Sequence, residues 1–421
     1  MMKKKIILIS VSVLLFAGLM LGGFLIYNKR KMTRALDLPM IYIETANQEN
    51  IVSKENYLNC KITISNIDEK YQIDSESAKV KGRGNSTWAM YDKKPYKIKF
   101  DKKVDLFGNG KAKEWTLIAN HGDQSLMRNY LAYSVANKFE NFKYTTSTQF
   151  VELYVNSEYV GVYLLCEQVE VGKNRVEIED DLASVDTGYL LELDDKIVNE
   201  GQEGKDWFTS NGKTFAIKSP DTDDDGFTVE HINFIKNYMD ECFSVLESGD
   251  YLSVCNLIDV ESFAESYILN ELFKTTDVFM SSFYMHKNAG GKLSAGPAWD
   301  YDLSSGNCMY DNHSTETDYL YAKNNILFNM LLEYEEFDLL VGEKLKQYKT
   351  VIKETIEQKI QFVKNNYARS MERNFDRWKI LGVYVWGNSD EVAKIKTWEG
   401  QVDYLKEWLD DSFEYLIKTY I

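Results

Sequence analysis

The sequence lacks the residue clusters that usually hold zinc or build a disulfide framework. It has only four His and five Cys, with no Cys-x-x-Cys pair and no Cys/His metal spacing. An odd number of cysteines excludes complete pairing within the chain. Cys242 and Cys255 could form a bridge, but we expect isolated thiols in the core. The sequence also has no internal repeats and no low-complexity tracts.

Positive charge is scarce outside the N-terminus. Of the 49 Lys and Arg residues, seven lie within the first 34 positions. The other 42 compare with 65 Asp and Glu residues. Contacts with phosphate backbones need a basic face. The acidic balance therefore argues against nucleic acid as a partner.

One long apolar run is present, and it lies at the N-terminus. An uncharged stretch from Ile6 to Asn28 has Lys or Arg residues on both sides. About 21 apolar or small residues are enough to span a bilayer, whereas a cleaved signal peptide usually has a shorter core. We expect residues 1–35 to be a signal-anchor or transmembrane segment that holds the bulk of the chain outside the cytoplasm. Cleavage after Ala17 or Gly22 would instead give a secreted protein.

Short strand patterns dominate residues 36–225. They are rich in β-branched and aromatic residues and are separated by turn residues. One helix interrupts them at about 125–139, with Asp123 as its N-cap. The expected strands are 41–43, 61–64, 78–81, 96–100, 115–118, 149–155, 160–169, 188–194 and 214–218.

Helical periodicity dominates residues 226–421. The change follows residues 221–226, which resemble the start of a calcium loop, but position 232 is Ile where that loop needs Glu. We interpret this segment as a solvated linker. The sequence thus predicts an α+β protein with one strand-like region, 282–299, in its second half. The expected helices are 229–247, 259–273, 325–332, 335–365 and 395–419.

Two carboxylates, Asp300 and Asp302, end the strand-like region. Residues two apart in an extended chain point to the same side, so both could ligate one hard cation such as Mg²⁺. Asp277 follows the amphipathic helix at 259–273. Phosphoryl transfer uses such a set, with one carboxylate for the attacking hydroxyl and others for the metal. The alternative is that the pair only caps the following turn.

Three further features could contact a nucleotide. Two glycines flank Arg83 and would let backbone N–H groups approach an anion, although a tight hairpin turn has the same composition. Lys97 and Lys99 share one face of a strand. Two lysines placed in this way could bind phosphate, or they could simply be solvated residues of an edge strand. The strand at 161–169 runs into a polar segment that could offer backbone groups to a purine.

These motifs, in this order, resemble the CotH-type (spore coat protein H) atypical protein kinase family. The resemblance implies a bilobal protein-kinase-like fold, with a β-rich nucleotide-binding lobe at 36–225 and a helical catalytic lobe at 226–421. It implies transfer of the ATP γ-phosphate, with Mg²⁺ or Mn²⁺, to Ser or Thr of a protein in the cell envelope or coat. It covers nearly everything after residue 40 and is carried by 83–88, 94–99, 115–129, 161–167, 277–284, 296–302 and 373–378.

The resemblance also implies roles for individual residues. Asp277 matches the catalytic Asp and Asp300 the metal-binding Asp, to which we add Asp302 as a second ligand. Lys97 or Lys99 would contact the phosphates. Arg83 and Arg128 are further candidates for this contact.

The chain departs from the family pattern at two points. Ser282 stands where some members have Asn as a metal ligand, and a hydroxyl is a poorer ligand than an amide carbonyl. The early helix has no Glu before Glu140, so the Lys–Glu pair of protein kinases would need Glu167 or Glu152. Glu167 is also a predicted nucleotide-binding residue.

Two other functions remain open. A catalytically weak or inactive structural or binding protein of the envelope or spore coat would fit Ser282 and the missing Glu. A metal-dependent glycosyltransferase would also use an Asp-x-Asp pair. It should show a doubly wound α/β half, whereas strands and helices are segregated here.

Overall fold

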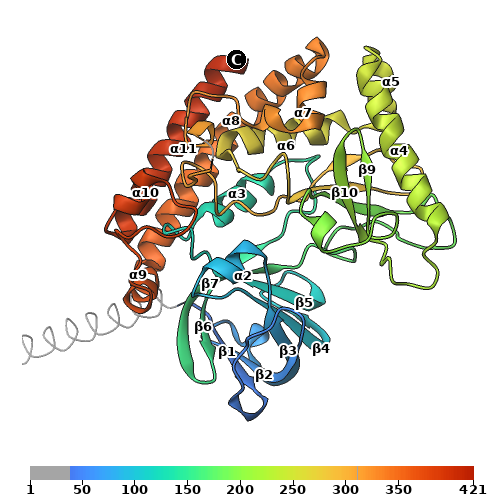
Figure 1. The fold of residues 1–421 in the computed structure, drawn as a ribbon. Coiled ribbons are helices and arrows are strands. Elements are labelled where there is room, and N and C mark those ends of the chain that lie inside the picture. The colour runs from blue at the N-terminus through green and yellow to red at the C-terminus, as the bar shows by residue number, and fades with distance from the viewer. Residues whose placement is uncertain (1–37, 311) are drawn as a thin grey trace, which may run out of the picture.

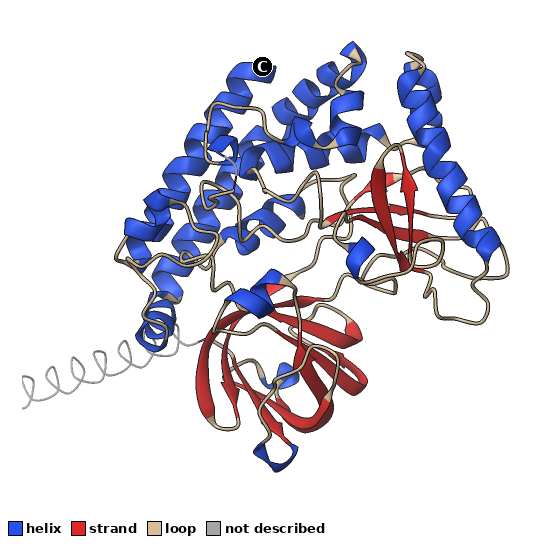
Figure 2. Ribbon diagram, in the orientation of Figure 1, coloured by secondary structure: helices blue, strands red, loops and turns tan. Residues whose placement is uncertain are grey.

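The computed structural model describes residues 38–310 and 312–421, which form an α+β fold (Figures 1 and 2). The expected N-terminal anchor, residues 1–35, lies outside this part of the chain. Across the residues that are described, no helix has both the length and the apolar character needed to cross a bilayer.

Seven strands of the described chain close into a barrel in the order β1-β2-β3-β4-β5-β7-β6. Neighbouring strands run antiparallel, except that β1 and β6 pair in parallel and close the barrel. Side chains alternate between interior and surface along a strand, and Ile43, Ile62 and Trp115 are among those that fill the interior. The strands are β1 (Met40–Thr45), β2 (Leu58–Ser65), β3 (Ile73–Gly82), β4 (Tyr96–Asp105), β5 (Lys111–Ile118), β6 (Thr148–Val155) and β7 (Glu158–Glu167).

A second sheet of the described chain is antiparallel and has the strand order β12-β11-β8-β10-β9. It joins strands from both sides of residue 225, where the sequence predicts a domain boundary. That boundary stays a prediction. The strand β9 was not expected from the sequence. The strands are β8 (Tyr189–Leu193), β9 (Trp207–Ser210), β10 (Lys213–Ser219), β11 (Phe283–Lys287) and β12 (Ser294–Ala295).

Helices form the part of the molecule opposite the barrel (Figure 2). At their centre, α6 (Val260–Phe273) is buried on every side from Ser262 onward and packs against α3, α8 and α11. The five expected helices are all present, and the early helix is shorter than predicted. The other helices are α2 (Ser86–Met90), α3 (Arg128–Ala136), α4 (Val229–Glu247), α5 (Tyr251–Leu257), α7 (Ile326–Leu331), α8 (Glu335–Asn366), α9 (Ala368–Arg377), α10 (Asp390–Lys394) and α11 (Trp398–Tyr420).

Helix α9, which the sequence did not predict, fastens the helical part to the barrel beside β7 (Figure 1). The Asn374 Oδ1 accepts hydrogen bonds from the Val162 N–H at 3.0 Å and from the Lys93 amine at 2.9 Å. Burial lowers the pKa of Lys93 well below its usual value. Arg373 forms an ion pair of 2.6 Å with Glu152 on β6. The 373–378 motif therefore has a structural role in joining the two parts.

Candidate functional site

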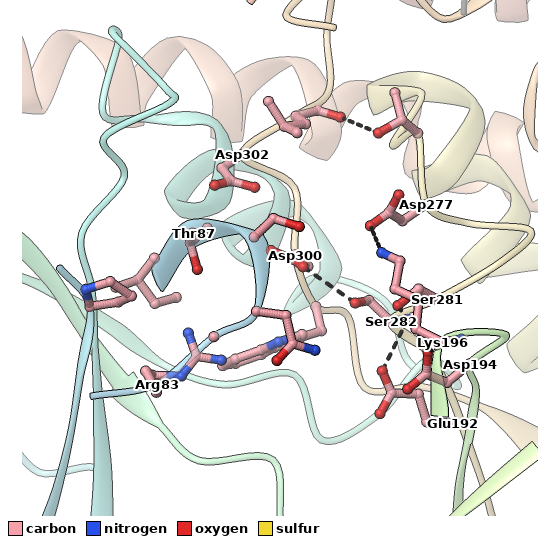
Figure 3. A pocket seen from close by; sticks show the side chains of 18 of the residues that line it. Arg83, Thr87, Glu192, Asp194, Lys196, Asp277, Ser281, Ser282, Asp300 and Asp302 are labelled. Atoms are coloured by element: carbon pink, nitrogen blue, oxygen red, sulfur yellow. Dashed lines mark hydrogen bonds and ion pairs between the residues drawn. The ribbon is translucent and has the colours of Figure 1, made fainter. Parts of the chain in front are cut away.

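A cavity of about 680 Å³ lies where the barrel meets the second sheet and the helices (Figure 3). This volume lies within the usual range for small-molecule sites. Four connections supply most of its polar lining. They are residues 83–87 from the end of β3 into the start of α2, 192–197 at the end of β8, 276–282 after α6, and 299–303 after β12. Asp277, Ser282, Asp300, Asp302 and Arg83 all line it.

Asp277 lies in the turn that follows α6. The turn is closed because the Asp277 carbonyl accepts the backbone N–H groups of Met280 and Ser281, each at 2.9 Å. The carboxylate of Asp277 pairs with the amine of Lys196 at 3.2 Å. Burial raises the pKa of Asp277, Lys196 opposes that effect, and the charge of Asp300 adds to it, so that the pKa stays above its usual value. A carboxylate in this setting binds a proton more readily than one in water.

Side chains of α3 hold the segment that carries Asp300. The backbone N–H of Asp300 donates to the Tyr133 hydroxyl at 3.1 Å, and that of Tyr301 donates to Asn129 Oδ1 at 2.7 Å. The Thr275 hydroxyl donates to the Asp300 carbonyl at 3.1 Å. The segment is therefore fixed through its backbone, which leaves the carboxylates available to the cavity.

The expected extended geometry of residues 300–302 is wrong. Strand β12 ends at Ala295, and Asp300 has a φ of 66°, in the left-handed region that non-glycine residues seldom adopt. Ser282 (φ 60°) and Asn120 (φ 48°), which also line the cavity, share this conformation. Such residues cost about 1–3 kcal/mol each and cluster at functional sites.

Asp302 is a buried carboxyl group that has no cationic partner among the described residues. Burial raises its pKa well above the usual value, and repulsion from Asp300 adds to this effect. Lys196 and Lys218 pair with other carboxylates, so neither Asp300 nor Asp302 has an ion pair within the described part of the chain. Hard oxygen donors without a counter-charge suit a divalent cation.

A ready-made metal site is nevertheless incomplete. Among residues 38–310 and 312–421, no three His, Cys, Asp or Glu side chains lie close enough to hold an ion by themselves. Mg²⁺ is often bound by only one or two carboxylates, together with waters and substrate phosphates. The residues present fit that mode and not a cage made of protein alone.

Two residues connect Asp300 to the second sheet. The Ser282 hydroxyl donates to Asp300 Oδ2 at 3.3 Å, and the Ser282 backbone N–H donates to Glu192 at 3.0 Å. Glu192 is buried, which raises its pKa, and pairs with Lys218 at 3.3 Å. Figure 3 shows that Glu192, Ser282 and Asp300 follow one another in this order along the wall of the cavity.

Sequence reasoning missed five charged residues of the lining: Glu192, Asp194, Lys196, Glu200 and Lys218. A signal was present for the first two, because acidic residues two apart in and after the apolar run 189–193 point to the same side of a strand. Lys196 carried no such signal, since only the fold brings it to Asp277.

Arg83 is the predicted nucleotide-binding residue that lines the cavity. Its guanidinium lies 5.4 Å from the centre of the Trp299 ring. Next to it, Gly84 has a φ of 81°, and a Cβ atom there would overlap the Thr87 hydroxyl. The glycine therefore allows the chain to turn tightly at this point.

The other four predicted nucleotide-binding residues are not in the lining. Lys97 and Lys99 pair with Glu114 on the neighbouring strand β5. Arg128 is fully buried, pairs with Asp123 at 2.6 Å and donates to the Ser304 and Ser305 carbonyls.

Glu167 borders a separate, smaller cavity. It accepts a hydrogen bond from Thr146 and lies 3.6 Å from Arg175. The other candidate for a Lys–Glu pair, Glu152, is bound to Arg373. Nucleotide contact by these residues stays a prediction.

Comparison with known proteins identifies a family. The family model described as CotH kinase protein matches residues 80–416, which include all four connections of the cavity. No curated protein matches the chain.

Proposed function

The chain belongs to the CotH kinase protein family, and we propose on this basis that it is an atypical protein kinase. It would transfer the γ-phosphate of ATP to Ser or Thr of a protein. We interpret the barrel and the helical part as the two lobes of a bilobal, kinase-like fold. The observation that carries the proposal is the meeting of Asp277, Asp300, Asp302 and Arg83 in one cavity between these parts. If residues 1–35 anchor the chain in a membrane with its bulk outside, the acceptor is an envelope or coat protein.

Arg83 is the residue we propose for the phosphates of ATP. Its charge faces the cavity, and guanidinium groups bind phosphate oxygens in a bidentate manner. Gln168 and Val169 follow β7 and also line the cavity, so their segment can accommodate the purine. The roughly 680 Å³ of the cavity leaves room for a nucleotide together with part of an acceptor.

Asp300 and Asp302 are the residues we propose for Mg²⁺ or Mn²⁺. When bound, the metal would neutralise charge on the nucleotide phosphates. Asp300 is positioned by the Tyr133 hydroxyl and by Ser282, whereas Asp302 is buried and has no cationic partner among the described residues. Ser282 would act through Asp300 or as a further, weaker ligand.

Asp277 is the residue we propose for the acceptor. Its carboxylate would orient the Ser or Thr hydroxyl and take up the proton as the oxygen bonds to the γ-phosphorus and the bond to ADP breaks. A raised pKa suits a group that must accept a proton. Lys196 would keep Asp277 in place and ionised until the hydroxyl arrives.

A weakly active or inactive binding protein is a second candidate. Two observations favour it: the Ser282 hydroxyl donates to Asp300, and the described residues hold no complete metal site. A glycosyltransferase has less support, because both sheets of the described chain are largely antiparallel and neither is doubly wound.

The test uses the full chain with γ-labelled ATP, each divalent metal and a generic Ser/Thr acceptor, with ATP binding measured separately. We expect label on the acceptor, loss of transfer but not of ATP binding in Asp277→Ala, and loss of both in Asp300→Ala. Transfer that persists in either variant contradicts the assignment. Binding without any transfer by the wild type supports the second candidate.

A further inference from the structure

An exposed apolar surface lies at the mouth of the cavity. The proposed phosphate transfer does not itself require this surface. The surface consists of Met309, Tyr310, Val383 and Tyr384, here called the rim patch, and each is 50–53 % exposed. Isolated apolar residues on a surface need no explanation, but a group of large ones often marks a place where a partner binds.

The rim patch unites two segments that lie far apart in the chain. The Tyr384 hydroxyl donates to the Met309 sulfur at 2.7 Å, and the Met309 N–H donates to the Gly387 carbonyl at 3.1 Å. The ring of Tyr310 lies 5.4 Å from that of Trp386. Residues 309–310 and 383–387 therefore form one continuous surface.

Buried amide groups hold this surface in place from behind. Gln124 donates to the Val383 carbonyl at 3.0 Å and to Asn388 at 3.1 Å, and Asn388 in turn donates to the Gly122 carbonyl at 2.6 Å. A surface that is already ordered loses little conformational entropy when a ligand binds.

The rim patch is continuous with the candidate active site. Tyr310 and Trp386 line the cavity themselves. Tyr310 lines the same cavity as Asp277 and Asp302. A polypeptide that places a hydroxyl at Asp277 would therefore extend over Tyr310.

We propose that the rim patch binds one large apolar side chain of the acceptor polypeptide, close in sequence to the Ser or Thr that is phosphorylated. This inference rests on the proposed kinase function and adds the substrate class. The acceptor segment carries Leu, Met, Phe, Tyr or Trp beside the hydroxyl residue. No Asp or Glu lies between them, because Asp277 and Asp302 would repel one.

The test measures binding and phosphorylation of Ser-centred peptides by the full chain. The peptides are built from Gly, Ala and Lys, and one Leu is moved through each position around the Ser. We expect one or two positions at which Leu tightens binding about tenfold or more, as burial of one Leu side chain should give. Met309→Ser combined with Tyr384→Ser should abolish this preference and leave ATP binding unchanged.

Two control variants separate a specific surface from general stickiness. Tyr384→Phe keeps the apolar area and should keep the preference. Leu252→Ser removes an apolar side chain that is 76 % exposed on α5 and should also keep it. Equal binding of all peptides, or a preference that survives in the double Ser variant, overturns the proposal.

The two readouts distinguish this inference from the proposed function. A Leu preference in binding with no phosphate transfer supports the docking surface and refutes the kinase. Transfer with no dependence on Leu supports the kinase and refutes the docking surface.

Discussion

Lys196 and Asp277 form an ion pair of 3.2 Å across the wall of the cavity. Lys196 lies in the connection that follows β8, and Asp277 in the turn after α6, so the pair links the second sheet to the helical part. The two connections touch again where the Asp195 N–H donates to the Met280 carbonyl at 2.8 Å. This contact sets the position of the residue on which the proposed transfer depends.

We predict that Lys196→Met lowers kcat for phosphate transfer by about tenfold or more, because Asp277 loses the ion pair that positions it and keeps it ionised. The KM for ATP should change little. Lys196→Arg, which restores the charge, should recover most of the rate. The control is Lys213→Met. Lys213 also forms an ion pair, with Asp195, but neither residue lines the cavity. An unchanged kcat in Lys196→Met would refute the role of the pair.

We predict that Asp302→Asn makes the metal-free protein more stable above about pH 4. Because the pKa of Asp302 is raised on folding, the folded state holds its proton more tightly than the unfolded state. Stability therefore falls as pH rises from the unfolded pKa towards the folded one. The Asn variant should lack this fall, which thermal unfolding between pH 4 and 8 will show. A lower Tm for the variant across that range would contradict the prediction.

Metal binding should strengthen with rising pH. The carboxyl groups of Asp302 and Asp277 have raised pKa values, and a carboxyl group must lose its proton before it ligates or faces a cation. The increase in Tm caused by Mg²⁺ with ATP should therefore be larger at pH 8 than at pH 5. In Asp302→Asn most of this pH dependence should vanish. A metal effect that is independent of pH in the wild type would argue against these ligands.

Arg83→Met should weaken ATP binding by about tenfold to a hundredfold, because this is the loss of affinity expected when one hydrogen bond to a charged group is removed. Lys99→Met is the matched control, since Lys99 pairs with Glu114 and does not line the cavity. Binding can be followed by calorimetry with Mg²⁺. If Lys99→Met has the larger effect, the phosphates lie elsewhere than proposed.

The contact of α9 with the barrel should contribute strongly to stability. Asn374→Leu removes the acceptor of the Val162 N–H and of the buried Lys93 amine. The loss should cost about 1–3 kcal/mol of unfolding free energy, because buried donors are left unpaired. Lys379→Ala, which removes an exposed ion pair with Asp376, should cost far less. Urea titration of the two variants measures the difference.

The sequence predicted most strands and helices because their periodicity is local. It did not predict that the first strands close into a barrel, since the parallel pairing of Met40 on β1 with Glu152 on β6 joins residues far apart in the chain. The sequence does not predict helix α9, although Arg373, Asn374 and Trp378 belong to a motif that the family resemblance includes. Its hydrogen bonds to the barrel, which explain these residues, appear only in the fold.

The candidate site was predictable in part. Asp277, Asp300, Asp302 and Ser282 line one cavity, as their order in the chain suggested. Lys97 and Lys99 do share a strand face. The alternation of side chains along a strand does not show, however, which face of a barrel lies next to a cavity.

Two other features of the site needed the fold itself. Nothing in the sequence showed that the charge of Arg128 is neutralised by Asp123. The backbone of Asp300, which is left-handed, is held by hydrogen bonds with Tyr133 and Thr275 that only the fold brings together.

The central claim is that Asp300 and Asp302 bind a metal next to ATP phosphates while Asp277 faces the γ-phosphate. A crystal structure of the full chain with Mn²⁺ and a non-hydrolysable ATP analogue, using the anomalous signal of manganese, tests it most directly. We predict a manganese peak within bonding distance of Asp300 or Asp302, with the γ-phosphate between it and Asp277. Manganese or nucleotide bound outside this cavity, with both carboxylates free of metal, would contradict the account.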